Sequence, residues 1–229
     1  MNHFYIPAET LEDWRRLLVD PEKHWKDGYS AKCLATRWWE AKGFPAEITE
    51  SFIKSEFPFF EQLQFVVGFP EHKEPLPGKG NPSQTDLMVL ARSNAEFVVV
   101  AVEGKVDESF GSLVGEWLRK PSAGKIKRFA FLAERLGLAG QDLTSVRYQL
   151  LHRSVSALLT AEHFAARHAV VLIHSFSTTR TGFNYYSDFL RLFKLEAMVG
   201  TVQRAAILGG IELYFSWTVG PANKPVAMT

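Results

Sequence analysis

The sequence predicts an α/β (α+β) protein in which helices flank a central mixed β-sheet. Helical patterns fill the first 55 residues, apolar runs of strand character lie between 63 and 106, and helices alternate with strands after residue 126. The chain has 229 residues, of which 46% are hydrophobic and 22% charged. That composition fits one domain over residues 1–229 with a sizeable buried core.

The N-terminal part is predicted to be helical. Residues 9–19 form a short amphipathic pattern. Ser30 is the expected N-cap of a second helix over 31–42, because a serine oxygen can accept a bond from a free N–H of the first turn. A third helix is expected over 46–55, with Pro45 at its start.

Three strands are predicted next. The first is 63–69, followed by a loop over 70–82 that is rich in proline and glycine. Strands over 86–92 and 97–106 are separated by a link of hairpin length. The second of these is apolar on both faces as far as Val102, which indicates a central strand.

The remaining elements alternate between helix and strand. Helices are predicted over 126–136 and 145–167, then a buried strand over 169–176. A helix over 185–198 and a strand over 211–219 complete the pattern. Helices therefore precede, interrupt and follow the strands.

Acidic and basic residues meet at the end of the central strand. Glu103 and Lys105 are two residues apart, so both project from the same face, and the hairpin brings Asp86 back beside them. Mg²⁺ prefers carboxylate, carbonyl and water oxygens, so Asp86, Glu103 and the backbone carbonyl of Gly104 would suffice to hold it. Lys105 would orient water or stabilise charge on a phosphate.

A simpler interpretation of these residues is that they end a strand at the surface. An aspartate followed at loose spacing by Glu-x-Lys recurs by chance. Their position on the second and third strands, with helices before and after, favours the functional interpretation.

These residues also carry a family resemblance. Pro82 to Asp86, followed by Glu103-Gly104-Lys105, resembles the PD-(D/E)XK nuclease superfamily. Thr85 stands in place of the motif's proline directly before Asp86, a proline that many members also lack. The resemblance implies a restriction-endonuclease-like core of order αβββαβ, placed at about 30–176, with an extension at 1–29 and a helix and strand at 185–219. It also implies Mg²⁺- or Mn²⁺-dependent cleavage of DNA, with Asp86 and Glu103 as ligands and Lys105 as catalyst.

Other segments resemble an uncharacterised bacterial family, from which no substrate follows. These are His24-Trp25-Lys26-Asp27-Gly28-Tyr29-Ser30-Ala31 and Tyr148-Gln149-Leu150-Leu151-His152-Arg153.

Helical residues supply further candidates. The resemblance implies that a helix glutamine, here Gln149, lies beside the metal site, and that Glu40 is an outer metal ligand. A solvated Glu40 is an equal alternative. Arg153 has the geometry to hold a phosphate bidentately, whereas His152 would do so when protonated or as a neutral donor.

The basic segment from Arg119 to Arg128 is the best phosphate-contact candidate by charge. Lys125, Lys127 and Arg128 lie at its end, although such a run is more often a solvated surface. The whole chain has a net charge of +1, so it exerts no long-range attraction on nucleic acid.

The remaining features bound the class of protein. A single cysteine, Cys33, suits a reducing cytoplasm, and no run approaches the roughly 18 apolar residues that a membrane span needs. The expected partner is nucleic acid rather than a membrane, and a homodimer is left open. A binding or assembly protein that keeps the nuclease fold without activity is the alternative function.

Overall fold

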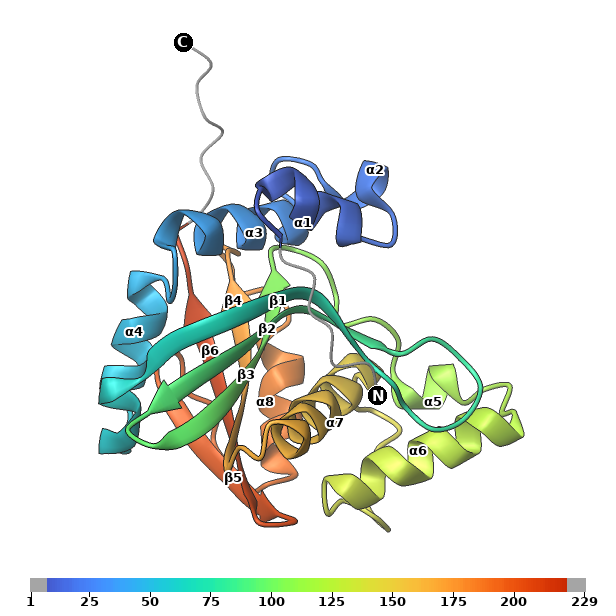
Figure 1. The fold of residues 1–229 in the computed structure, drawn as a ribbon. Coiled ribbons are helices and arrows are strands. Elements are labelled where there is room, and N and C mark those ends of the chain that lie inside the picture. Colours follow the sequence, from blue (N-terminus) through green and yellow to red (C-terminus); the bar gives the residue numbers. More distant parts are fainter. Residues whose placement is uncertain (1–7, 222–229) are drawn as a thin grey trace.

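The computed structural model describes residues 8–221, and its central element is one six-stranded β-sheet (Figure 1). The strand order is β1-β2-β3-β4-β6-β5, in which β4 runs parallel to β3 and β6 and the other pairs are antiparallel. The strands are β1 (Gln64–Glu74), β2 (Ser83–Ser93), β3 (Glu96–Lys105), β4 (His168–Ser175), β5 (Val202–Leu208) and β6 (Ile211–Val219). The predicted fold class, a mixed sheet flanked by helices, is confirmed.

Helices cover both faces of the sheet and give it two separate cores. Alternation along β2 sends Leu87 and Val89 toward α1, α3, α4 and η1, and Met88 toward α6, α7 and α8. The helices are α1 (Leu11–Leu17), α2 (Pro21–His24), α3 (Ser30–Ala41), α4 (Ala46–Ile53), the 3₁₀ helix η1 (Pro58–Gln62), α5 (Val114–Trp117), α6 (Ala123–Arg135), α7 (Tyr148–His163) and α8 (Phe183–Arg191). Within residues 8–221, no helix is long and apolar enough to cross a membrane.

The first strand is longer than the sequence predicts. β1 continues through Pro70 to Glu74, into the segment predicted as a loop. Proline lacks a backbone donor, but β1 lies at the edge of the sheet, where only one side of the strand must pair. The predicted end of this strand at residue 69 is therefore wrong, because the proline and glycine of the next segment indicated a loop.

The start of α3 also differs from the prediction. Ser30 is the first helical residue rather than the N-cap, which is Tyr29. The Ser30 N–H donates to Glu108 Oε1 at 2.9 Å, so a carboxylate from the segment after β3 caps this helix. This contact holds the start of α3 at the end of the central strand.

The outermost strand, β5, is absent from the sequence-based prediction. Its residues are mostly small or polar, and a bulge between Arg204 and Ala206 breaks the alternation. Gly209 and Gly210 both have positive φ and form the turn to β6. A Gly-Gly pair between two strand-like runs is a hairpin signal, and it was present in the sequence.

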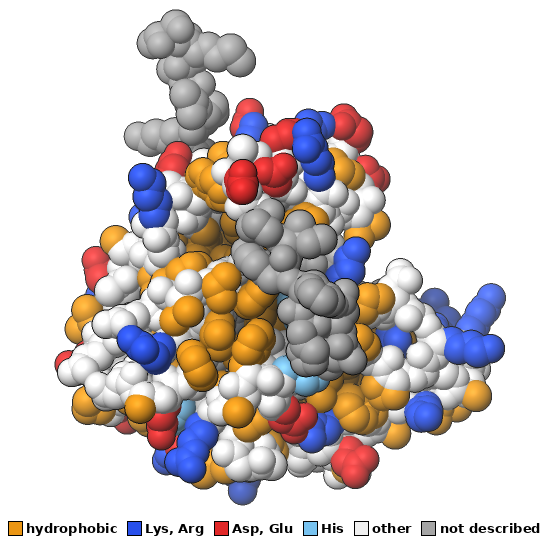
Figure 2. Space-filling view, viewed as in Figure 1, with side chains coloured by type: hydrophobic (Ala, Val, Ile, Leu, Met, Phe, Trp, Pro, Cys, Tyr) orange, Lys and Arg blue, Asp and Glu red, His pale blue; other side chains and the backbone are white. Residues whose placement is uncertain are grey.

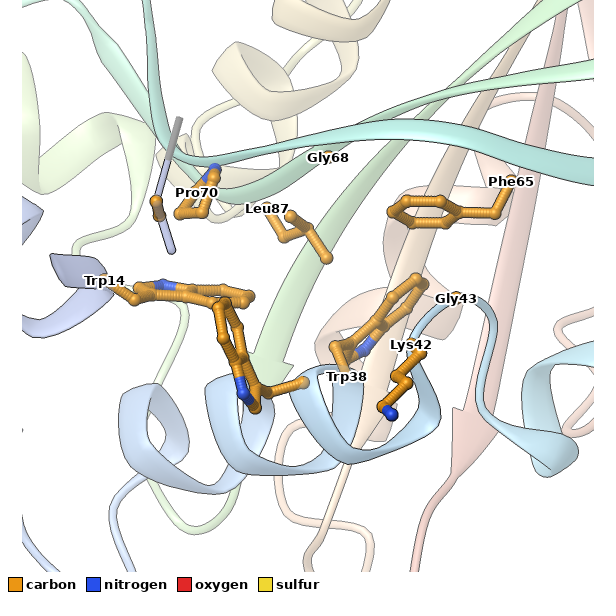
Figure 3. Close-up of a pocket in the computed structure, with 10 residues that line it drawn as sticks. Trp14, Trp38, Lys42, Gly43, Phe65, Gly68, Pro70 and Leu87 are labelled. Atoms are coloured by element: carbon orange, nitrogen blue, oxygen red, sulfur yellow. The ribbon is translucent and has the colours of Figure 1, made fainter. Parts of the chain in front are cut away.

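An apolar pocket of about 330 Å³ lies between α3 and the edge strand (Figure 3). Trp14, Trp38 and Phe65 surround it, and Figure 2 shows hydrophobic side chains gathered on this face of the molecule. The Trp38 indole N–H donates to His174 Nδ1 at 3.1 Å beneath the pocket. Trp38 is therefore a buried packing residue.

Candidate functional site

The β2–β3 hairpin brings the two predicted acidic ligands together. Leu87 pairs with Val102, so Asp86 lies opposite Glu103. The Gly104 N–H donates to Asp86 Oδ2 at 2.9 Å, which fixes the aspartate against the next strand. The Glu103 side chain is 4% exposed, whereas that of Asp86 is 20% exposed. Of the two, only Asp86 is open to solvent.

Glu103 is surrounded by donors. Its Oε1 accepts bonds from Lys105 Nζ at 2.8 Å and Gln149 Nε2 at 2.5 Å, and its Oε2 accepts from Arg153 Nε at 2.6 Å. Lys105 Nζ also donates to Gln149 Oε1 at 3.1 Å. The structure therefore brings four predicted site residues into one hydrogen-bonded group, with two of them supplied by α7.

Arg153 lies between the two acids. Its Nη2 is 4.0 Å from Asp86 Oδ1, while its Nε contacts Glu103. The sequence suggests a phosphate ligand at this position, but in the structure the guanidinium is buried against carboxylates. A positive charge thus occupies the space that a bound cation would share with Asp86 and Glu103.

Glu71 is a third carboxylate at the site, which no pattern in the sequence indicates. The pairs Pro70 with Leu87 and His72 with Thr85 flank it, so it faces Asp86 across the strands. Glu71 has a φ of 51° and accepts a bond from Gln84 Nε2 at 2.8 Å. No local pattern marked it, because it follows a proline in a predicted loop.

These acids line one cavity, here called the acid pocket. Its volume is about 230 Å³, and residues from β1, β2, β3, α3 and α7 surround it. The lining residues include His24, Ser30, Glu71, Asp86, Glu103 and Arg153. Because these elements and α2, which carries His24, meet here, the site depends on the complete fold rather than on one local motif.

Charge in the acid pocket is incompletely balanced. Burial and the charge of Glu103 raise the pKa of Asp86 to about 7, and burial and Asp86 raise the pKa of Glu71 to about 8. Burial would also raise the pKa of Glu103, but Arg153 and Lys105 outweigh it and hold that pKa at about 2. Three carboxylates face two cations, so the site favours either protons or an added cation.

The metal-free protein should therefore lose stability as the pH rises. Unfolded Asp and Glu titrate near pH 4, whereas Asp86 and Glu71 titrate near 7 and 8 in the fold. The folded state binds more protons between these values, so the free energy of unfolding should fall from pH 4 to pH 8. Urea denaturation in EDTA measures this fall for the wild type and for Asp86→Asn.

The Asp86→Asn variant serves as the control, because other groups also titrate in this range. The wild type should lose more stability with rising pH than the variant does. A pH dependence identical in the two proteins would show that Asp86 does not carry the effect.

The donor set suits a hard divalent cation. Asp86, Glu103 and the carbonyl of Gly104 offer oxygen atoms, which Mg²⁺ and Mn²⁺ prefer. Among residues 8–221, no three His, Cys, Asp or Glu side chains are arranged to enclose a metal ion. An ion here would therefore rely on these two carboxylates, the Gly104 carbonyl and water, since Mg²⁺ commonly keeps several waters.

Glu40, the predicted outer ligand, lies away from this site. The acid pocket is lined by Ser30 and Ala31 at the first turn of α3, whereas Glu40 is exposed near its last turn. Ten helical residues span about 15 Å. In the structure Glu40 is a solvated glutamate, as the alternative interpretation of the sequence expects.

His152 is next to the site but faces away from the acids. Its Nδ1 is 2.9 Å from Ser83 Oγ, and Ser83 Oγ also accepts a bond from Arg153 Nη1 at 3.3 Å. Burial and the charge of Arg153 lower the pKa of His152 well below its ordinary value. His152 is therefore neutral, which leaves it the role of a neutral donor or acceptor.

The three basic candidates of α6 have different environments. Lys127 is exposed and does not line the acid pocket, so the structure gives it no place in the site, whereas Lys125 Nζ donates to the Trp117 carbonyl at 2.6 Å. Arg128 is buried and donates to three backbone carbonyls of the loop between β1 and β2, those of Leu76, Pro77 and Asn81. Arg128 thus holds a loop in place, a role that its charge alone did not reveal.

Comparisons with known proteins identify a family without assigning a role. Residues 7–222 match the family described as a domain of unknown function, DUF6946, and the chain belongs to this family. No curated protein and no solved structure matches the chain.

Proposed function

We propose that this member of the DUF6946 family is a divalent-metal phosphodiesterase that hydrolyses nucleic acid, with DNA as its expected substrate. One observation carries the proposal: Asp86 and Glu103 converge on a single cationic group, with Lys105 bound to the same glutamate. Two carboxylates can hold a divalent ion that activates water, and a lysine beside them can offset charge on a phosphate. The resemblance to the PD-(D/E)XK superfamily supports the same conclusion.

Each residue of the site has a distinct role in this proposal. Asp86, Glu103 and the Gly104 carbonyl would hold Mg²⁺ or Mn²⁺, which activates water and offsets charge on the phosphate. Lys105 is 5% exposed in its side chain and its ammonium is held beside Glu103, where it would act on a phosphate oxygen at low solvent screening. Gln149 orients this ammonium, and Arg153 balances the acids when no metal is bound.

A cleavage assay tests the proposal directly. Supercoiled plasmid, single-stranded DNA and RNA are each incubated with Mn²⁺ or Mg²⁺, and the products are separated on gels. We expect metal-dependent cleavage of DNA that EDTA abolishes and that Asp86→Asn lacks. Cleavage that persists in EDTA, or in Asp86→Asn, would assign any activity to a contaminant or to a different site.

Gln149→Ala should separate positioning from metal binding. Gln149 contacts both Glu103 and Lys105 but is not a proposed ligand. Cleavage should fall by about tenfold, the lower range for a residue that orients a metal-site group. Mn²⁺ affinity measured by calorimetry should remain within about threefold, since both carboxylates stay. An unchanged cleavage rate would show that Gln149 does not position Lys105.

A binding or assembly module is the second candidate function. The observation that favours it is the saturation of Glu103, whose two oxygens are already engaged by Lys105, Gln149 and Arg153. In that case the buried charges hold the strands and α7 together rather than bind a metal. The protein should then bind neither Mg²⁺ nor Mn²⁺ at millimolar concentration.

A further inference from the structure

A second polar cavity, here called the basic pocket, lies on the other side of Ser83 from the acid pocket. Its volume is about 320 Å³, and it is enclosed by the loop between β1 and β2, by α5 and α6, and by the start of α7. The residues that line it include Lys79, Ser83, Trp117, Lys125, Arg128 and His152. Figure 2 shows Lys and Arg side chains gathered over the end of the molecule that α5 and α6 form.

The charged residues that line the basic pocket are all cationic. Of the residues that the structure describes, Lys79, Lys125 and Arg128 line it, and no aspartate or glutamate does. A guanidinium has five N–H donors and an ammonium three. Arg128 uses three donors on backbone carbonyls and Lys125 uses one on Trp117. Both residues thus keep donors for an anion, and Lys79 makes no ion pair with a carboxylate among the described residues.

The loop that carries Lys79 is rigidly attached to α6. Gly78 has a φ of +86°, and a side chain there would lie 2.3 Å from the Gly124 carbonyl oxygen. Only glycine permits this close approach. Together with the three bonds from Arg128, the contact fixes the loop before any ligand arrives, which reduces the entropic cost of binding.

The two pockets share a wall of consecutive residues. Ser83 lines the basic pocket and Gln84 the acid pocket; likewise His152 lines the first and Arg153 the second. The Arg153 to Ser83 hydrogen bond crosses this wall. A group bound in the basic pocket therefore lies next to the site of the proposed chemistry.

We infer that the basic pocket binds a second, uncleaved phosphate of the same nucleic-acid strand whose reacting phosphate lies at the acid pocket. The inference rests on the proposed function for the identity of the ligand. Its support is the exclusively cationic lining, the fixed loop, and the shared wall. Binding there positions the strand and sets its register against Asp86 and Glu103.

The test compares two lysines of the same helix. Lys125 lines the basic pocket, and Lys127, two residues along α6, does not line it and is exposed. Lys79→Gln, Lys125→Gln and Lys127→Gln each remove one charge. Binding of a fluorescent thymidine tetranucleotide is measured by polarisation in EDTA across a range of salt concentrations, and binding of inorganic phosphate by calorimetry. Thermal melting confirms that each variant folds.

Lys79→Gln and Lys125→Gln should each weaken tetranucleotide and phosphate binding by about tenfold, as expected for loss of a charge-assisted bond. The slope of log affinity against log salt should decrease by about 0.7, the value for one phosphate contact on a single strand. Lys127→Gln should change neither quantity by more than about twofold.

Three results would overturn the inference. These are no loss in the two pocket variants, an equal loss in all three variants, or a loss confined to inorganic phosphate, which would assign the pocket to free phosphate. If the pocket variants behave as expected but the wild type cleaves nothing, the proposed function fails and the phosphate pocket stands. If the wild type cleaves DNA and the pocket variants bind it normally, only the inference fails.

Discussion

Glu103→Gln is expected to abolish Mn²⁺ binding and to lower the free energy of unfolding by about 3 kcal/mol. The loss of stability is expected because removing one partner of a buried ion pair leaves the other charge buried and unpaired. Glu103 accepts bonds from Lys105 and Arg153, and its side chain is 4% exposed. The substitution keeps the size of the side chain but leaves two buried cations without their shared anion. Urea denaturation in EDTA measures the stability, and calorimetry measures the metal.

Asp86→Asn is the matched control for this prediction. The asparagine side chain would keep an oxygen to accept the Gly104 N–H, and Asp86 is the acid whose charge the fold tolerates poorly. The variant should lose Mn²⁺ binding with little or no loss of stability at pH 8. If the two substitutions destabilise the protein equally, Glu103 is not the acid on which the buried charges of Lys105 and Arg153 depend.

Lys105→Met is expected to lower metal-dependent cleavage by about two orders of magnitude, the usual loss when one donor to developing charge is removed. Lys105 is buried, and its Nζ lies 4.8 Å from the centre of the Phe110 ring, so a methionine side chain can fill much of the same apolar space. Mn²⁺ affinity should change by only a few fold, because lysine is not a ligand.

Single-turnover cleavage and calorimetry on the same preparation separate the two effects. Lys127→Met removes an equal charge from an exposed position and should leave cleavage unchanged. Lys105→Met is also compared directly with Glu103→Gln in Mn²⁺ binding. If both variants lose binding completely, Lys105 maintains the metal site rather than taking part in the reaction.

The convergence of Asp86, Glu103 and Lys105 could be predicted because it depends on local rules. A short turn joins the two strands, and the period of two along a strand fixes which residues share a face. The burial of β3 followed from its unbroken apolar run in the same way. Short-range geometry therefore accounts for the positions of these three residues in the candidate site.

The remaining features depend on tertiary context that a single sequence does not carry. Glu71 enters the site only because β1 continues through Pro70 at an edge of the sheet. Arg153 and Arg128 have the same side chain, yet one contacts carboxylates and the other backbone carbonyls. A long flexible cation takes the partner that the fold presents, so its role cannot be assigned from its charge.

Calorimetric titration of Mn²⁺ into the wild type and Asp86→Asn at pH 8 tests directly whether Asp86 and Glu103 bind a metal ion. This pH lies above the pKa values of Asp86 and Glu103, so both proposed ligands are largely ionised and protons compete little with the metal. We expect a saturable exchange of heat with the wild type at millimolar Mn²⁺ and none with Asp86→Asn. No binding by the wild type, or equal binding by the two proteins, would contradict a metal site at Asp86 and Glu103.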